Sequence, residues 1–225
     1  QLLSDFQEIR PHYIAIMPNT LKRMYDRILK RGDFLSPTRK KLLHWSLKVG
    51  EEYPEQGISF FYWIKLQLAS LFAYRRWRKL SGKRLEEIIV GMDVAPIHLL
   101  KLPIAAGFNL KEIYGLTETT SIISINKFNA GSYHFGTVGK KMLDVRVKMD
   151  TSQSGEIWVK GENVMLGYYQ LDESDSNSLK ADGWFKTGDK GQINQNQFLT
   201  LVGREDFIFE TSSGRLVSAQ QIERY

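Results

Sequence analysis

The chain contains no cysteine and only four histidines among its 225 residues. The missing thiols exclude disulfide scaffolds, thiolate zinc sites and cysteine nucleophiles in one step. The histidines lack the spacing of a metal site, so an ordinary structural role is expected for each of them: His12, His44, His98 and His134. The sequence therefore predicts neither a disulfide-stabilised protein nor a histidine-based metal centre.

Long hydrophobic runs are also scarce. The segment 58–74 is mostly apolar, but it contains Lys65, Gln67 and Ser70 and is shorter than the roughly 20 residues that a bilayer span needs. We expect a buried or interfacial helix there. A basic run follows, and it fits either a solvated face or contact with anionic lipid headgroups: Arg75, Arg76, Arg78, Lys79, Lys83 and Arg84.

The sequence also lacks an amino-terminal targeting segment. It begins at Gln1 rather than at a methionine, and Tyr225 comes soon after what reads as a helix start at 218–223. We therefore expect an internal piece of a longer protein. A cytoplasmic location is expected, with peripheral membrane contact through the basic segment as an open alternative.

The composition that is present fits a folded protein. Hydrophobic residues make up 42% of the chain and aromatic residues 12%, enough to bury one or two sizeable cores. The net charge of +6 suits nucleic acid, an anionic membrane or nucleotides, because each offers phosphate groups to Lys and Arg. We expect the tryptophans to pack cores or line a pocket rather than stack on bases, so no nucleic-acid partner is expected.

The first quarter of the sequence has helical periodicity. Apolar residues between 19 and 32 recur at three- and four-residue spacing, with Asn19 as the expected cap and Gly32 as the end. Ser36 followed by Pro37 marks a second helix start. Together these signals predict a helical hairpin.

Strand signals begin later in the chain. A strand at 86–90, a helix at 97–106 and a strand at 111–114 form a strand-helix-strand unit, whereas short alternating strands such as 145–149 and 156–160 follow after about residue 131. The fold class is therefore α/β with a parallel sheet, plus a small β-rich subdomain. The expected divisions are an α/β portion with a helical insertion at 1–130, a β-rich subdomain at 131–203, and a hinge with the start of a carboxy-terminal domain at 204–225.

The first motif with chemical content is Tyr-Gly-Leu-Thr-Glu-Thr-Thr at 114–120. It follows a predicted strand, which is where α/β folds bind ligands. An aromatic face and a bare glycine backbone can flank a base, a threonine hydroxyl can donate to phosphate, and a glutamate supplies the oxygen ligand that magnesium prefers. Taken alone, the segment fits a capped helix start equally well, with Thr117 or Thr119 as the cap.

A second motif spans 182–191 and contains the glycine-flanked Asp189, and Gly203-Arg204 follows about fifteen residues later. An ionised carboxylate only accepts hydrogen bonds, so it pairs naturally with two ribose hydroxyls, while an arginine can bind sugar or phosphate. Taken alone, an ordinary aspartate turn beside a surface arginine explains this segment as well.

In combination and in this order, the motifs resemble the adenylate-forming superfamily of acyl-CoA synthetases, luciferases and peptide-synthetase adenylation domains. The segments before residue 91 are similar to long-chain acyl-CoA synthetases in particular. The matching stretches are 10–13, 17–18, 22–26, 80–85, 114–120, 155–161 with 167–169, 182–191, 203–204, 212–214 and 221–223.

The resemblance implies roles for six residues. Tyr114 and Gly115 would flank adenine, and Asp189 and Arg204 would bind ribose. Thr117 and Glu118 would take part in catalysis, the former by contacting phosphate and the latter by holding magnesium. The implied reaction uses ATP and Mg²⁺ to convert a fatty acid to its acyl-adenylate and then transfers the acyl group to coenzyme A.

The sequence departs from the family pattern in several places. Met92-Asp93-Val94 stands where relatives show a glycine pair, and Glu205-Asp206-Phe207 stands where they place Lys-Asp after Gly-Arg. The phosphate loop and the late catalytic lysine have no counterpart in these residues, so this segment alone is expected to be inactive. Three alternatives stay open: a non-catalytic nucleotide- or acyl-binding relative, a ligase for an aryl or amino acid, and a basic nucleic-acid-binding protein.

Overall fold

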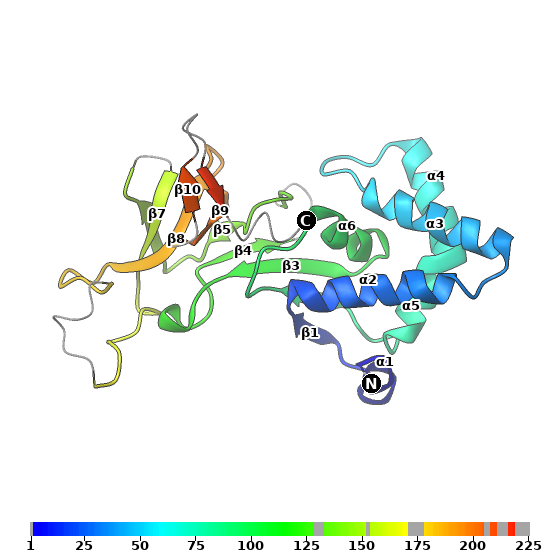
Figure 1. Ribbon diagram of the computed structural model, residues 1–225, viewed down its shortest axis with the longest axis horizontal. Coiled ribbons are helices and arrows are strands. Elements are labelled where there is room, and N and C mark those ends of the chain that lie inside the picture. The colour runs from blue at the N-terminus through cyan, green and yellow to red at the C-terminus, as the bar shows by residue number, and fades with distance from the viewer. Residues whose placement is uncertain are drawn as a thin grey trace. The chain divides into compact units, whose positions relative to one another are not determined.

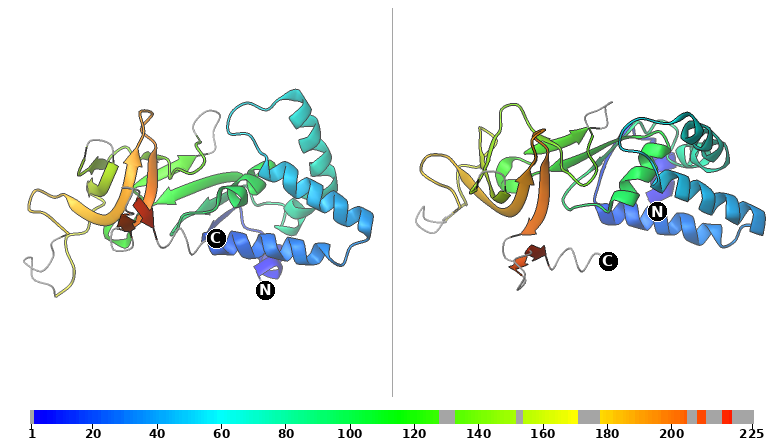
Figure 2. Two further views of the ribbon diagram at one scale, coloured as in Figure 1. Left: turned by 45° about the horizontal axis from the view of Figure 1, so that its top comes forward. Right: turned by 90° about the horizontal axis from the view of Figure 1, so that it is seen from above.

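The computed structural model describes residues 2–127, 133–151, 154–170, 178–204, 208–210 and 216–218. The chain forms two compact units (Figures 1 and 2). The first unit comprises Gln1–Glu112 with Lys127–Gly136, and the second comprises Ile113–Asn126 with Thr137–Tyr225.

The first unit is built on parallel strands. β1 (Tyr13–Ile16) pairs in parallel with β2 (Glu87–Val90), and β2 pairs in parallel with the first four residues of β3 (Asn109–Tyr114). Parallel neighbours need long crossover connections, which helices supply here. The helical elements are α1 (Leu2–Ile9), α2 (Pro18–Gly32), α3 (Pro37–Glu51), α4 (Phe60–Ala69), the π-helical turn η1 (Ser70–Tyr74), α5 (Arg75–Leu80) and α6 (Ile97–Ala105).

Apolar side chains from the strands, α3 and α6 form the core of this unit. Leu100 and Leu110 are fully buried, and Ile88 and Val90 of β2 are almost so. β2 is thus a short apolar run, as expected of a central parallel strand that is covered on both faces. Burial of its apolar side chains in this core stabilises α6 although Pro103 lies inside the helix.

The predicted helical hairpin is present, with one correction at its start. α2 begins at Pro18 after the extended residue Met17, so Asn19 lies in the first turn and is not the cap. Proline is favoured at this position because its missing N–H would have no partner in the first turn of a helix. The predicted end at Gly32 and the predicted second start at Pro37 are confirmed.

The segment expected to be a buried or interfacial helix is helical from Phe60 onward, through α4, η1 and α5. Ser59 caps it by accepting a hydrogen bond from the Tyr62 N–H at 3.3 Å. Many of its large apolar side chains are exposed rather than buried. Among the residues that the structure describes, no helix has the length and apolar character needed to cross a membrane.

The second unit is predominantly antiparallel. β6 (Arg146–Met149), β7 (Ser154–Lys160), β8 (Phe185–Ile193) and β9 (Leu199–Arg204) form a four-stranded sheet in sequence order. β4 (Ser124–Lys127) pairs with β5 (Lys140–Lys141), and β10 (Ile208–Glu210) pairs with β11 (Leu216–Ser218). The expected α/β region with a parallel sheet and the expected β-rich region are thus both present.

The smaller core of the second unit includes Ile123, Ile157 and Val159, all fully buried. The possible helix start at 114–120 is only the 3₁₀ turn η2 (Thr117–Thr119), and the residue before it, Leu116, takes the cap position. The Leu116 N–H donates to Thr119 Oγ1 at 3.0 Å, and the Thr119 hydroxyl donates back to the Leu116 carbonyl at 3.1 Å. Neither threonine therefore caps a helix.

The three-part division at residues 130 and 203 stays a prediction. The Glu205-Asp206-Phe207 departure and the segments 212–214 and 221–223 lie outside the described residues. The other departure is described: Met92 has a φ of 72°, in the left-handed region that favours glycine, and its side chain is 87% exposed. The backbone at this position therefore keeps a glycine-like conformation although the residue is not glycine.

Candidate functional site

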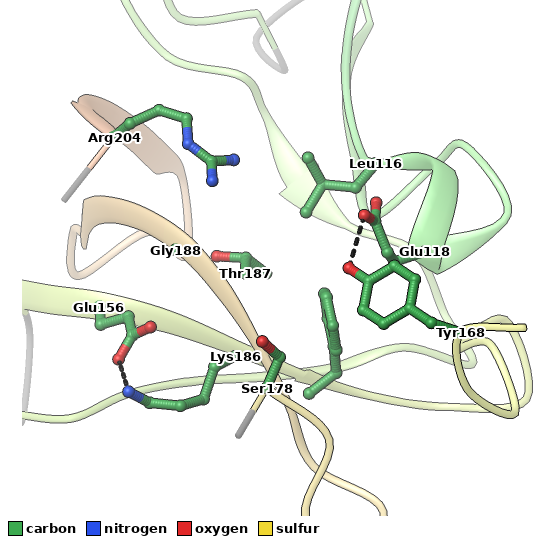
Figure 3. A pocket seen from close by; sticks show the side chains of 10 residues that line it. Leu116, Glu118, Glu156, Tyr168, Ser178, Lys186, Thr187, Gly188 and Arg204 are labelled. Atoms are coloured by element: carbon green, nitrogen blue, oxygen red, sulfur yellow. Dashed lines mark hydrogen bonds and ion pairs between the residues drawn. The ribbon is translucent and has the colours of Figure 1, made fainter. Parts of the chain in front are cut away.

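The second unit contains a cavity of about 280 Å³ (Figure 3). Its wall combines η2, the segment around residue 168, and strands β7 to β9. Acidic, basic and hydroxyl groups outnumber apolar ones, as in a site for a polar ligand. The lining residues are Leu116, Glu118, Glu156, Tyr168, Ser178, Phe185, Lys186, Thr187, Gly188 and Arg204.

Glu118 is held at the cavity by Tyr168. The Tyr168 hydroxyl donates to Glu118 Oε1 at 2.9 Å (Figure 3). Partial burial and this hydrogen bond raise the pKa of Tyr168 above its usual value. The backbone carbonyl of Glu118 also accepts a hydrogen bond from the Met165 N–H at 2.8 Å. Two contacts to one distant segment thus fix the position of this carboxylate.

Asp189 and Arg204 are brought together by strand pairing. They lie opposite each other in β8 and β9, with 3.7 Å between Arg204 Nη1 and Asp189 Oδ1. The Asp189 side chain is only 12% exposed, whereas that of Arg204 is 43% exposed. The arginine can therefore turn toward the cavity while it stays beside the carboxylate.

Tyr114 approaches the same carboxylate from β3. Its hydroxyl donates to Asp189 Oδ2 at 2.7 Å, and both residues are buried. Burial is the main cause that raises the pKa of Asp189, while the Tyr114 hydrogen bond and the Arg204 charge act in the opposite direction. Burial and the nearby Asp189 charge raise the pKa of Tyr114 well above its usual value. Tyr114 thus stays a neutral donor to the carboxylate.

Thr187 completes the support under Asp189. Its hydroxyl donates to the Ile157 carbonyl at 2.9 Å and accepts from the Asp189 N–H at 3.1 Å. β8 alternates between buried and less buried side chains, with Phe185, Thr187 and Asp189 on the buried side. A strand of period two therefore places the aspartate and its supporting threonine on one face.

Glycine is needed at two positions near the cavity because a larger side chain would collide with the protein itself, whether or not a ligand is bound. A Cβ on Gly115 would lie 1.5 Å from the Ser121 carbonyl oxygen, a distance that no side chain permits. Gly188 has a φ of +70°, and a Cβ there would lie 3.2 Å from Arg204 Nη2. Gly115 is thus required by its own loop, and Gly188 leaves room for the arginine.

The structure brings together some of the predicted site residues and not others. Glu118 and Arg204 line the cavity, and Asp189 lies beside Arg204 with Tyr114 behind it. Gly115 and the exposed Thr117 do not line the cavity. The adenine, phosphate, ribose and magnesium roles of these residues stay predictions.

Sequence reasoning missed several lining residues. Tyr168 belongs to a stretch that carried the family resemblance, but no role was predicted for it. Glu156 and Lys186 form an ion pair with 2.8 Å between their charged atoms. The alternating pattern of β8 could have indicated Thr187, since it has the same parity as Asp189. No sequence signal indicated that Tyr168 would meet Glu118, because 50 residues separate them.

The site could hold a metal ion only together with a ligand. Among the described residues, no group of three or more acidic or histidine side chains is placed to bind a metal. Of the two acids in the cavity wall, Glu156 is paired with Lys186. Mg²⁺ is commonly held by one or two carboxylates together with water and substrate phosphates. Glu118 fits that arrangement as a single protein ligand.

Comparison with known proteins identifies the class. Residues 1–169 match the AMP-binding enzyme family, and the chain belongs to that family. It is 28% identical over 239 residues to fatty acyl-CoA synthetase A of Dictyostelium discoideum, a match that covers 99% of this chain and 34% of that protein. It is 29% identical over 233 residues to long-chain-fatty-acid–CoA ligase 1 of Cavia porcellus, a match that covers 99% of this chain and 32% of that protein. The chain thus spans about a third of the length of these relatives.

Solved structures show the same fold. O-succinylbenzoate coenzyme A synthetase from Bacillus subtilis, in complex with its acyl-adenylate intermediate, matches with a TM-score of 0.66 at 20% identity. The match covers 99% of this chain and 37% of that chain. The same B. subtilis enzyme in complex with ATP and magnesium matches with a TM-score of 0.64. At this identity the likeness establishes the fold alone.

Proposed function

We propose that the protein containing this chain is an ATP-dependent fatty acid–CoA ligase. The observation that carries the proposal is the joint presence of Glu118 and Arg204 in one cavity, with Asp189 paired to Arg204, in a member of the AMP-binding enzyme family. A carboxylate, a cation and a second carboxylate at one site suit the phosphates, the metal and the ribose of a nucleotide.

The residues of this chain would mainly bind and orient ATP. The Asp189 carboxylate would accept hydrogen bonds from ribose hydroxyls, and its orientation is already fixed by Tyr114 and Arg204. Arg204 would offset negative charge on the sugar-phosphate side of the ligand. Glu118 would supply one oxygen ligand to Mg²⁺, which when bound neutralises phosphate charge.

In the proposed reaction a carboxylate oxygen of the acid attacks the α-phosphorus of ATP. A new bond between that oxygen and phosphorus forms while the bond to pyrophosphate breaks. The sulfur of coenzyme A then attacks the acyl carbon, releases AMP and leaves a thioester. This chain would contribute the electrostatic positioning, because rate enhancement depends on groups that are already in place when charge develops.

A fatty acid is the favoured substrate. Two relatives that match over 99% of this chain are named as fatty acyl-CoA synthetase and long-chain-fatty-acid–CoA ligase. The B. subtilis structural relative is named for an aromatic acid, o-succinylbenzoate, but it shares only 20% identity. The sequence relatives therefore support an aliphatic acid more directly than the structural one supports an aryl acid.

The test measures pyrophosphate release by the full-length protein with ATP, Mg²⁺ and a panel of acids. The panel contains long-chain fatty acids, benzoate and amino acids. Glu118→Ala should lower the rate with fatty acid about 100-fold or more, as expected for loss of a preorganised electrostatic group. Glu162→Ala is the matched control, because Glu162 is an exposed carboxylate of the same unit and does not line the cavity.

The outcomes separate the alternatives. Pyrophosphate release by wild type with fatty acids, together with loss of that release in Glu118→Ala but not in Glu162→Ala, supports the proposal. Release only with benzoate or an amino acid makes the protein a ligase for another acid. Binding of ATP without pyrophosphate release from any acid makes it a non-catalytic relative. Near-normal turnover of Glu118→Ala would overturn the metal role of this residue.

A further inference from the structure

The first unit has an apolar face that stays substantially exposed among the residues that the structure describes. Five side chains on α4 and η1 share one side of the helix, because each lies three or four residues from another member of the set. They are Phe61 (78% exposed), Ile64 (37%), Leu68 (43%), Leu71 (58%) and Phe72 (49%). Single exposed apolar residues are common on protein surfaces, but a continuous stripe marks an interaction site.

The opposite side of the same helix is anchored in the core. Ala69 and Ala73 are buried, and they allow the helix to approach α3 closely. The Tyr62 hydroxyl donates to the Val49 carbonyl at 2.6 Å, and the Tyr74 hydroxyl donates to the Ser46 carbonyl at 2.7 Å. These two bonds to α3 fix the rotation of the helix, so the stripe faces outward in this unit.

The stripe leads directly into positive charge. Arg75 and Arg76 follow Phe72 by three and four residues, and Lys79 follows one turn later. All three side chains are exposed. Within the stripe itself, Lys65 is also exposed, and its long side chain can carry the amino group beyond the apolar surface.

The basic end of the helix opens onto a second cavity, of about 860 Å³. It lies where the chain enters β1 and β2, which is the amino end of these parallel strands. Ligands of α/β folds bind at the carboxyl ends of the strands, so this cavity does not fit the usual place for such a ligand. The residues that line it are mainly basic: Gln7, Arg10, Arg76, Lys79, Leu80, Gly82, Lys83 and Arg84.

We propose that this face docks on the surface of a bilayer that contains anionic phospholipid. The apolar stripe would enter the headgroup region, and Arg75, Arg76 and the basic cavity would meet lipid phosphates. Amphipathic helices with aromatic residues on one side and Lys or Arg nearby bind membranes in this way. The half-exposed Trp63 belongs to a residue type that favours this interface.

Charge favours a membrane over a second copy of the chain as the occupant of this face. A phosphate-bearing surface satisfies the apolar stripe and the cations together, whereas a second copy of the chain would bring its own cations to the contact. Each Lys or Arg near an anionic surface contributes roughly 1 kcal/mol to binding. The proposal concerns a surface remote in sequence from the nucleotide motifs and does not rest on the ligase activity.

The test is vesicle flotation of the full-length protein without ATP or acid. Phosphatidylcholine vesicles are compared with vesicles that also contain phosphatidylserine. Phe61→Ser/Leu71→Ser should lower partitioning about 10-fold or more, because two apolar side chains no longer leave water. Arg75→Gln/Arg76→Gln should lower it about 5-fold for each lost charge, an effect that disappears at high salt.

Matched controls lie elsewhere on the surface. Leu143→Ser removes an apolar side chain that is 94% exposed in the second unit, and Lys22→Gln/Arg23→Gln removes two exposed charges from the start of α2. Neither control should change partitioning. Circular dichroism and thermal unfolding check that the variants fold, and the fluorescence of wild type compared with Trp63→Phe gives a second readout. The Trp63 contribution should shift to the blue on anionic vesicles.

Three outcomes would overturn the proposal. One is failure of the wild-type protein to float with phosphatidylserine vesicles. Another is equal flotation of the stripe variants and their controls. The third is a dimer on gel filtration that dissociates in Phe61→Ser/Leu71→Ser, which would assign the face to a second copy of the chain.

Discussion

The two units differ in where they place their buried acids. In the first unit, Glu87 pairs with Lys111, and Glu112 accepts a hydrogen bond from Tyr133. None of these four residues lines either of the two cavities described above. In the second unit, Glu156 lines the cavity and the buried Asp189 lies beside it. Buried charge is costly unless it is paired, so acids retained at a cavity indicate function more strongly than acids within a packed core.

The largest expected change is a loss of stability from a substitution in the packed core of the first unit. Leu100 is fully buried in the core of the first unit, so Leu100→Ala should lower the free energy of unfolding by about 2–5 kcal/mol. Urea denaturation of the full-length protein measures it. Leu143→Ala, at a site 94% exposed, is the control and should change stability by less than about 0.5 kcal/mol. A small loss for Leu100→Ala would show that this core is loosely packed.

A smaller effect, on ATP binding, is expected from Tyr114→Phe, which tests the support of the buried Asp189 in the second unit. The change removes the hydroxyl that donates to Asp189, a hydrogen bond to a charged group that contributes about 1.5–3 kcal/mol. Because this bond also lowers the pKa of Asp189, the acid limb of ATP binding should move to higher pH. Calorimetry of ATP binding across a pH series measures both changes.

Tyr169→Phe is the matched control for that experiment. Tyr169 is 90% exposed and adjoins the residue that holds Glu118, so loss of its hydroxyl should leave both affinity and pH profile unchanged. Unchanged ATP binding in Tyr114→Phe would mean that Asp189 needs no buried donor to keep its position.

The smallest expected effect comes from Asp189→Asn, which should raise the stability of the fold slightly but weaken ATP binding. Burial raises the pKa of Asp189 in the folded state, so its contribution to stability is present below the unfolded pKa of about 3.9 and is lost as pH rises through the folded value. Asp189→Asn does not titrate. It should therefore be slightly more stable than wild type at pH 7, by about 1 kcal/mol or less, with the gain shrinking toward pH 4.

The same Asp189→Asn variant should bind ATP more weakly, because an amide offers one acceptor where a carboxylate offers two. Thermal unfolding at several pH values and ATP titration measure the two quantities. The exposed Arg204 loses little when its partner becomes neutral, since exposed ion pairs contribute little. A variant that is both less stable and unchanged in affinity would assign Asp189 a purely structural role.

Much of the fold could be predicted from local signals. The proline at residue 37 and the glycine at residue 32 marked helix boundaries that the structure confirms, because proline fixes φ for a first turn and the freedom of glycine disfavours a helix interior. The apolar run at β2 and the alternation in β6 and β7 predicted strands, because burial on both faces or on one face of a sheet imposes these two patterns. The predicted start of α2 was wrong, because the fixed φ of Pro18 fits the first helical position, so the cap falls at Met17 and Asn19 lies in the first turn.

The site was predictable only in part. Glu118, Asp189 and Arg204 could be selected because their chemistry suits a nucleotide and because the motifs resemble a family. The contacts that hold them could not, since Tyr114 reaches Asp189 across 75 residues and Tyr168 reaches Glu118 across 50. Such contacts depend on the packing of the whole unit, which no local pattern contains.

Gly188 couples the register of a sheet to the placement of one positive charge. Its φ of +70° disfavours any other residue, and a Cβ there would lie 3.2 Å from Arg204 Nη2, close enough to press on the guanidinium. A substitution at residue 188 would thus strain β8 and also press on the arginine of the neighbouring strand. Variation at these two positions should consequently be coupled during evolution, although only one of them carries charge.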